Sequence, residues 1–388
     1  MEIMDRPVRL LVAGGVTGGH LFPGIAAADA LRDRIPDARV LFVSTGRPLE
    51  RAALARAGYP LRVVPFGGIK GRGPGGAMRT LAGLPLALFR ALRIVREFEP
   101  DIVLGLGGYA SVPGVLAARP GGALAVLHEQ NVRPGAANRL LARVAHRIYT
   151  AFPEVRGLPA DRVRFVGNPV RAAIRDAAGA PLPEGPFAVL VVGGSQGARG
   201  INRAVAEALP TLVRAGIRLM HQTGEADFPA MEAAFRAAGA SGEVRPFFAD
   251  MARRYRACHL VLSRSGASTA AEIAAVGRGA VLVPFPFAAD DHQTANARAL
   301  VAAGAAETIP ESAMDGDALA RILVRLADRP AQVAAMARAA RTLARPDAAS
   351  RMIADILALS ERFGRGRKGG FAKTAKSADS NLRSEGGE

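Results

Sequence analysis

Three glycine-rich turns are the features of this sequence that point most directly to ligand chemistry. Each follows an apolar run typical of a strand and precedes a run typical of a helix; they are Gly14–His20, Gly105–Tyr109 and Gly193–Gly197. Glycine lets the backbone approach a ligand closely, and a helix N-terminus offers free N–H donors and a partial positive charge. None of the turns has the G-x-G-x-x-G spacing with a downstream acid that binds dinucleotides, which disfavours a simple dehydrogenase. The turns predict large phosphate-bearing ligands held between two domains.

Two polar clusters supply candidates for acid–base chemistry. His20 stands where a helix is expected to begin, and a neutral imidazole can accept a hydroxyl proton at neutral pH. A histidine that only caps the turn is an equally good interpretation. The second cluster, His128–Asn131, follows the expected strand Ala123–Leu127. Because open α/β sheets bind ligands at the carboxyl ends of their strands, we favour a functional cluster over a polar loop.

The second and third glycine turns differ in how specifically they indicate a ligand. In the second turn, Ser111 before Pro113 fits a plain helix N-cap, although the extra glycines favour anion binding. In the third turn, the Ser195 hydroxyl and the nearby Arg199 guanidinium suit a diphosphate.

Two segments of the second half carry carboxylates that need interpretation. Thr269 and Glu272 have the spacing of a capping box, whereas a ligand-binding Glu272 would accept hydrogen bonds from a ribose diol. Asp290 and Asp291 are adjacent, so their carboxylates point apart and make a poor metal pair. We predict no closed metal site and no tightly bound cofactor, although stimulation by a divalent cation stays open.

The elements that must position these residues alternate between strand-like and helix-like runs, which predicts parallel sheets wrapped by helices. The expected strands are continuous apolar runs, as sheets covered on both faces require. They are Val8–Ala13, Val40–Ser44, Leu61–Pro65, Ile102–Leu106, Ala123–Leu127, Arg147–Thr150, Ala188–Val192, Arg218–Gln222, Glu243–Phe247, Leu260–Ser263, Ala280–Val283 and Ala305–Ile309. The two halves share this design, so the predicted fold is α/β with two Rossmann-like domains and a linker at Ala177–Pro186.

Composition and charge set the limits of this interpretation. The chain has 388 residues, 49% of them hydrophobic, which is enough for two cores. Its net charge of +17 favours anionic partners, but 4 Tyr and no Trp are few aromatics for a nucleic-acid-binding protein. Cys258 is the only cysteine, which excludes an intrachain disulfide. We expect no signal peptide or spanning helix, and a disordered basic tail over 364–388.

The segment from Lys70 to Arg96 could contact a membrane surface. Basic residues flank the apolar run Leu81–Phe89, and this pattern suits anionic lipid. The alternative is an ordinary helix with Leu81, Leu84, Leu88 and Leu92 packed inward. Gly75, Gly76 and Pro85 predict a loop or a broken helix here.

With these residues assembled, the chain resembles the MurG family of glycosyltransferases, which add N-acetylglucosamine to lipid I in peptidoglycan synthesis. The resemblance runs from about Leu10 to Leu300. It rests on the segments Thr17–His20, Gly107–Pro113, His128–Asn131, Gly167–Arg171, Gly193–Arg199, His221–Gly224, Ser263–Thr269 and Asp290–Gln293. The family's first turn usually reads Gly-Gly-Thr-Gly-Gly-His, and Val16 interrupts that pattern here.

The resemblance implies a GT-B fold with the donor, UDP-N-acetylglucosamine, in the cleft between the domains. The domains would be an acceptor- and membrane-side domain, 1–167, and a donor domain, 168–345, with a helix at about 346–363 packing back on the first. The implied donor-binding residues are Thr17, Gly18, Gly19, Asn131, Arg171, Ser195, Gln196, Phe248, Ala267, Ser268, Thr269, Glu272 and Gln293. The implied acceptor or membrane residues are Gly107, Gly108, Tyr109, Leu81, Leu84 and Phe89.

The implied reaction is an inverting transfer to the 4-hydroxyl of the muramoyl sugar of lipid I, which forms lipid II. We take His20 as the first candidate for the base and Glu129 as the second. Helix N-termini, Ser195 and nearby arginines would stabilise the leaving UDP. The implied partners are the donor, the lipid acceptor and an anionic membrane at the cytoplasmic face, with no nucleic acid. Another GT-B transferase or a nucleotide-sugar epimerase is the alternative enzyme, and a basic nucleic-acid-binding protein is a remote one.

Overall fold

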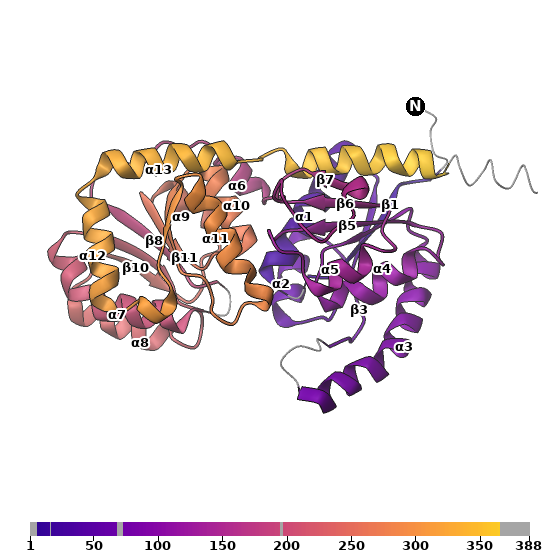
Figure 1. The fold of residues 1–388 in the computed structure, drawn as a ribbon, viewed down its shortest axis with the longest axis horizontal. Helices are drawn as coiled ribbons and strands as arrows, with labels where there is room; N and C mark the ends of the chain where they lie inside the picture. The colour runs from indigo at the N-terminus through magenta and orange to yellow at the C-terminus, as the bar shows by residue number, and fades with distance from the viewer. Residues whose placement is uncertain (1–5, 16, 68–72, 195–196, 365–388) are drawn as a thin grey trace, which may run out of the picture.

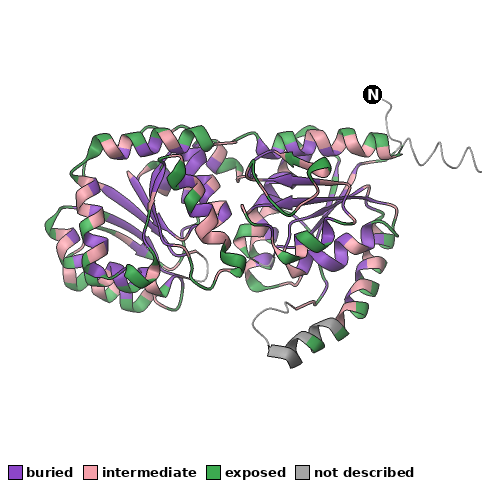
Figure 2. Ribbon diagram, viewed as in Figure 1, coloured by how far each residue is buried: buried purple, intermediate pink, exposed green. Residues whose placement is uncertain are grey.

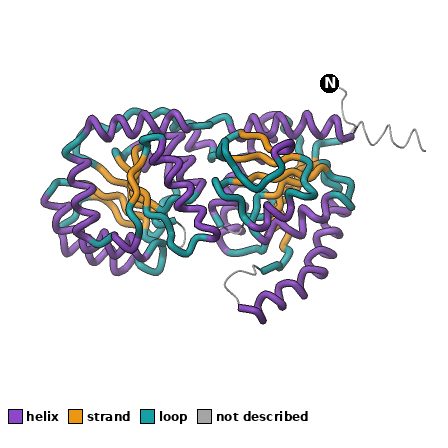
Figure 3. The backbone as a smooth tube through the Cα atoms, in the orientation of Figure 1, coloured by secondary structure: helices purple, strands orange, loops and turns teal. Residues whose placement is uncertain are grey.

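The computed structural model describes residues 6–15, 17–67, 73–194 and 197–364, with the backbone alone for 73–77 and 79–81. Two groups of strands lie side by side, each enclosed by helices (Figures 1 and 3). The predicted α/β fold with two Rossmann-like domains is confirmed, because each domain is built on one parallel sheet.

The first domain contains a seven-stranded parallel sheet with the order β3-β2-β1-β4-β5-β6-β7. The chain order reverses beside β1, between β1 and β4, and such a switch point is where open α/β sheets bind ligands. The strands are β1 (Arg9–Ala13), β2 (Arg39–Ser44), β3 (Leu61–Val63), β4 (Ile102–Gly105), β5 (Leu124–Glu129), β6 (Arg147–Thr150) and β7 (Val163–Phe165).

The second domain repeats this plan with a six-stranded parallel sheet in the order β10-β9-β8-β11-β12-β13. Its switch point lies between β8 and β11. The strands are β8 (Ala188–Val192), β9 (Arg218–Gln222), β10 (Gly242–Arg245), β11 (Leu260–Ser263), β12 (Gly279–Leu282) and β13 (Ala306–Thr308).

Helices cover both faces of each sheet, so the central strands are buried along their whole length (Figure 2). In the first domain they are α1 (Gly18–Arg34), α2 (Pro48–Ala57), α3 (Gly73–Phe98), α4 (Val112–Ala118) and α5 (Ala136–Leu141). In the second they are α6 (Ala172–Arg175), α7 (Arg199–Arg214), α8 (Phe228–Ala238), α9 (Met251–Arg256), α10 (Ala267–Val276), α11 (His292–Ala302), α12 (Gly316–Ala327) and α13 (Pro330–Leu343). A last helix occupies residues 348–364.

The chain passes between the domains twice, and the two crossings touch. Val166 belongs to the core of the first domain, whereas Ile174 belongs to the core of the second. Gly167 lies between them with φ +96, and a Cβ there would lie 2.4 Å from Cβ of Arg345, on the returning segment. Only glycine combines this backbone with so close a neighbour. The predicted linker at Ala177–Pro186 is wrong, because Ala177 is already buried in the second core.

The sequence located twelve of the thirteen described strands and missed β7. Two further expectations need correction. β5 continues to Glu129, so His128 and Glu129 lie within the strand rather than after it. α3 is one helix from Gly73 to Phe98 with Pro85 inside it, and neither a loop nor a break.

The last helix, 348–364, packs on the first domain (yellow in Figure 1). Met352, Ile353 and Ile356 are buried among residues of the first sheet and its helices. The Tyr149 hydroxyl donates a hydrogen bond of 2.8 Å to Asp355 Oδ2. A helix that follows the second domain thereby completes the core of the first domain.

We expect Ile356→Ala to destabilise the first domain by about 2–5 kcal/mol, because the change removes a fully buried side chain and leaves a cavity. Urea denaturation followed by circular dichroism measures this change. Arg351→Ala, an exposed position on the same helix, is the matched control and should change stability by less than about 0.5 kcal/mol. Equal effects of the two variants would contradict the packing described here.

Candidate functional site

The candidate site lies where the carboxyl ends of the two sheets face each other across the domain boundary. The first two glycine turns follow the adjacent strands β1 and β4 and touch one another there. Gly14 has φ +113, and a Cβ on it would lie 3.0 Å from the Gly107 carbonyl oxygen. The turns are therefore packed as one unit at the switch point of the first sheet.

His20 lies in the first turn of α1. This helix begins at Gly18, and Thr17 is its N-cap residue. Its Nδ1 is 3.0 Å from Thr17 Oγ1. Desolvation by burial, and to a lesser degree the nearby His292 of the second domain, lower the pKa of His20 to about 4. The imidazole is therefore neutral at pH 7 and faces the second domain.

His128 is fully buried and serves the domain crossing. Its Nε2 is 3.1 Å from the Gly167 carbonyl oxygen, and its Nδ1 is 3.1 Å from the Gln130 side-chain nitrogen. Burial lowers the pKa of His128 to about 4, partly opposed by the Gly167 hydrogen bond. With Gln130 donating to Nδ1, the single ring proton lies on Nε2 and is donated to Gly167.

Glu129 is buried, and both of its carboxylate oxygens accept hydrogen bonds. Oε1 accepts from the backbone N–H of Asn131 at 2.9 Å and from its side-chain amide at 3.2 Å. Oε2 accepts from the Gly135 N–H at 3.1 Å and from the Asn138 amide at 2.9 Å. A carboxylate engaged in this way holds the loop 131–135 in place, which argues against its role as the second candidate base.

The N-terminus of α10 faces the first glycine turn across the boundary. The N-cap of α10 is Gly266, with no side-chain cap, so the first N–H groups of the helix have no partner within it. The Ser268 hydroxyl donates a hydrogen bond of 2.9 Å to the Gly19 carbonyl oxygen of the first domain. The alternative interpretation of Thr269 and Glu272 as a capping box is wrong, because both residues lie inside the helix that Ala267 begins.

The Glu272 carboxylate is held from two sides. Arg171 Nη2 lies 2.8 Å from Oε1, and the Tyr255 hydroxyl donates to Oε2 at 3.2 Å. The Arg171 guanidinium also stacks over the Phe22 ring of α1, 4.6 Å from its centroid. Arg171 therefore joins the helices α1 and α10 of the two domains.

Two predicted donor contacts are engaged within the second domain. Phe248 is buried and packs under the Arg254 guanidinium, 4.4 Å from the ring centroid, while its N–H donates to Gln222 Oε1 at 2.9 Å. Gln293 Oε1 accepts a hydrogen bond of 2.9 Å from the Phe285 N–H.

Comparison with known proteins decides between the families that share this fold. Residues 10–150 match the glycosyltransferase family 28 N-terminal domain, and residues 188–352 match the family's C-terminal domain. A protein of Syntrophus aciditrophicus named UDP-N-acetylglucosamine--N-acetylmuramyl-(pentapeptide) pyrophosphoryl-undecaprenol N-acetylglucosamine transferase is 43% identical, covering 91% of this chain and 99% of that protein. A relative of the same name from Anaeromyxobacter dehalogenans strain 2CP-1 is 44% identical, covering 90% and 92%. The crystal structure of Acinetobacter baumannii MurG superimposes with a TM-score of 0.72 at 32% identity, covering 90% and 99%.

The chain belongs to the MurG family of glycosyltransferases. The family resemblance drawn from the sequence is thus confirmed. The site residues expected from that resemblance stay predictions. Thr17, Gly19, Asn131, Arg171, Ser268 and Glu272 come together at the domain boundary. Ser195 and Gln196, like Val16 and the tail 365–388, lie outside the described residues.

The second glycine turn of this MurG-family chain has one packed glycine and one open glycine. Gly107 lies against the Asn138 amide, whereas a Cβ on Gly108 would meet open space. The Ser111 hydroxyl donates a hydrogen bond of 2.8 Å back to the Gly108 carbonyl oxygen instead of capping α4. The Tyr109 hydroxyl accepts a hydrogen bond from Arg47 at 3.2 Å. The space beside Gly108 is therefore the open part of this turn.

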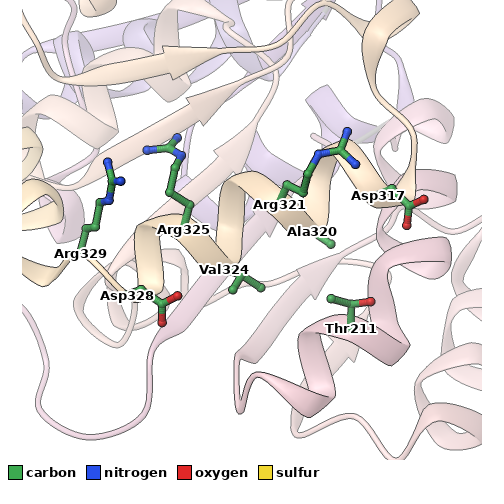
Figure 4. Close-up of a pocket in the computed structure, with 8 residues that line it drawn as sticks. All are labelled: Thr211, Asp317, Ala320, Arg321, Val324, Arg325, Asp328 and Arg329. Atoms are coloured by element: carbon green, nitrogen blue, oxygen red, sulfur yellow. The ribbon is translucent and has the colours of Figure 1, made fainter.

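Outside the domain boundary, the described residues can be judged by what a metal site, a membrane span or a pocket requires. Within the described ranges, no group of three His, Cys, Asp or Glu side chains is placed to hold a metal ion, and no helix is long and apolar enough to cross a membrane. A hollow beside α12 is lined by Thr211 of α7 and by Arg321 and Arg325, among others (Figure 4). It belongs to the second domain alone.

Two residues at the boundary escaped the sequence analysis, namely Tyr255 on α9 and Asn296 on α11. Both are fully buried and hydrogen-bonded to predicted site residues, to Glu272 and to Asn131 respectively. Nothing in the sequence around Tyr255 indicates that its hydroxyl would contact Glu272. Asn296 could have been found, because a polar amide between the apolar residues of a helix needs hydrogen-bond partners when buried.

We expect Glu129→Gln to destabilise the protein by about 1–3 kcal/mol, because the new amide donor would face groups that are themselves donors. Faster amide hydrogen exchange in 131–135 would accompany this loss. Glu97→Gln, a partly exposed position on α3, is the control and should change neither quantity. Full protection of the loop combined with lost turnover would instead favour Glu129 as a base.

Proposed function

We propose that this protein transfers N-acetylglucosamine from UDP-N-acetylglucosamine to the 4-hydroxyl of the muramoyl sugar of lipid I, with inversion at the anomeric carbon. The observation that carries this proposal is the 43% identity, over 99% of its length, to a protein whose name gives the two substrates and the transferred N-acetylglucosamine. The acceptor hydroxyl and the inversion follow from the family resemblance. We propose that both substrates bind at the polar boundary between the two parallel sheets. Lipid II and UDP would be the products.

The proposed base is His20. Its Nδ1 is bonded to Thr17, and among the described residues its Nε2 has no hydrogen-bond partner. With the ring proton on Nδ1 and donated to Thr17 Oγ1, Nε2 is free to accept. The acceptor hydroxyl oxygen attacks the anomeric carbon, its proton moves to Nε2, and the bond to the diphosphate breaks with its electrons on UDP. The low pKa of His20 keeps the ring neutral before this step.

The proposed donor site uses groups from both domains. The uncapped N–H groups of α10, at Ala267, Ser268 and Thr269, would face the diphosphate, where negative charge increases as UDP leaves. Glu272 would accept hydrogen bonds from the ribose hydroxyls, in place of Tyr255 or Arg171 or beside them. Gln293 would contact the sugar, together with Asn131 from the first domain.

The proposed membrane contact is the exposed side of α3. Its large apolar residues Met78, Leu86 and Phe89 are 71%, 55% and 65% exposed, and Arg90 and Arg93 are exposed beside them. Leu84 is partly buried against the first core, so the proposed surface excludes it. An acceptor with an undecaprenyl chain must be met at a bilayer, and we place the enzyme peripherally at the cytoplasmic face, where UDP-sugars are available.

We expect His20→Ala to lower turnover at saturating donor by about 100-fold or more, the usual contribution of a general base. Calorimetric binding of UDP serves as the control for an intact donor site. Near-normal turnover would remove His20 from the role of base, and release of UDP without lipid I would favour an epimerase instead.

The pH dependence gives a second test of the same group. Because burial lowers the pKa of His20 to about 4, the base is lost only as the pH falls through that value. We expect kcat/KM to stay level from neutral pH to about one unit above this pKa. A limb near the ordinary histidine pKa of about 6.5 would contradict the assignment.

We expect Phe89→Ser to weaken binding to vesicles of anionic phospholipid by about tenfold, since a large apolar side chain would no longer enter the lipid. Co-sedimentation measures this loss. Phe287→Ser, which alters an 84% exposed aromatic in the second domain, is the matched control. Equal losses for the two variants would indicate nonspecific adhesion rather than a surface on α3.

A further inference from the structure

The two domains meet at the site through polar contacts, and most of these are exposed to water. The Ser268 hydroxyl bonds to Gly19, Arg133 donates to the Asp290 carbonyl oxygen at 3.1 Å, and Arg139 pairs with the Asp290 carboxylate at 3.3 Å. Exposed polar contacts exchange readily with water and stabilise a single arrangement only weakly. An interface of this kind leaves two domains free to separate unless something else holds them.

Asn296, on α11 of the second domain, differs from these contacts because its side chain is fully buried. Its Oδ1 accepts a hydrogen bond of 3.1 Å from the Val132 N–H, and its Nδ2 donates to Asn131 Oδ1 at 3.1 Å. The same Nδ2 lies 3.2 Å from the Ser265 carbonyl oxygen of its own domain. One amide therefore bonds two consecutive residues of the opposite domain and one residue of its own.

The groups that Asn296 joins are fixed on both sides. In the first domain, Asn131 is held through its N–H and its amide by the buried Glu129 carboxylate. In the second, the Ser265 hydroxyl donates a hydrogen bond of 2.8 Å to the Gln293 carbonyl oxygen, which ties the start of α11 to the turn that leads into α10. Asn296 thereby links the loop that carries Asn131 to the N-terminus of α10.

We propose that Asn296 is a positioning residue that latches the two domains in the closed arrangement and sets the Asn131 amide against the donor. Separating the domains would break both bonds to the first domain and leave Asn131 without the partner that orients its oxygen. Donor binding and domain closure would then favour one another. The donor part of this inference rests on the proposed function, whereas the closure part does not.

The test compares Asn296→Asp and Asn296→Ala with Arg133→Ala, which removes an exposed contact between the same two domains. Asn296→Asp keeps the shape and the acceptor for Val132 but replaces the donor with a carboxylate facing two oxygens. Dyes on Arg56→Cys and Arg236→Cys, exposed positions on α2 and α8, report the distance between the domains by single-molecule energy transfer. Cys258 is buried and does not compete for the label.

We expect both Asn296 variants to lengthen the mean distance between the dyes in the free protein and to weaken UDP-N-acetylglucosamine binding by about tenfold, because each variant loses the amide donor to Asn131 and Ser265. In both Asn296 variants, turnover at saturating donor should lie closer to the parent value than kcat/KM does. Arg133→Ala should stay within about twofold of the parent in each measurement. Unchanged distances in both Asn296 variants would overturn the latch. If the parent protein failed to bind the donor, the proposed function would fail while the distances still tested closure.

Discussion

The buried Glu129 carboxylate is the group on which the site's geometry depends. Removing a carboxylate from water is costly unless hydrogen-bond donors replace the lost solvent, and here four N–H groups do so. Two of them belong to the backbone of the loop that follows β5. The charge is therefore stable only when that loop has one shape. The loop residues that the first domain presents to the second at this edge, Asn131 and Val132, take their positions from this requirement.

Two histidines of the first domain illustrate how their surroundings separate a structural role from a chemical one. Burial holds both His20 and His128 neutral, with pKa values of about 4. His128 uses both ring nitrogens, one on Gly167 at the domain crossing and one on Gln130. His20 uses Nδ1 on Thr17 and faces the opposite domain. The same shift in pKa thus accompanies a structural role in one ring and a proposed catalytic role in the other.

Much of the fold could be predicted because parallel strands that are covered on both faces have continuous apolar sequences. β7 escaped because it is three residues long, lies at an edge of its sheet and is only partly buried. The glycine turns were found through local sequence, whereas the phosphate-facing role expected of the α10 N-terminus stays a prediction. The hydrogen bonds of Glu129 to Gly135 and Asn138 could not be predicted, because the sequence does not state which donors a carboxylate meets. Its role as the second candidate base stays a prediction.

The division into two complete cores explains why the chemistry lies at a polar boundary. Each sheet buries its own apolar clusters, and the final helix completes the first core from the far end of the chain. Little apolar surface then needs to be covered between the domains at the site, so their contacts can be polar and reversible. A transferase must admit a nucleotide sugar, exclude water during transfer and release UDP. A boundary closed by a few hydrogen bonds, with both cores intact on either side, can open for each of these steps without loss of folding free energy in either domain.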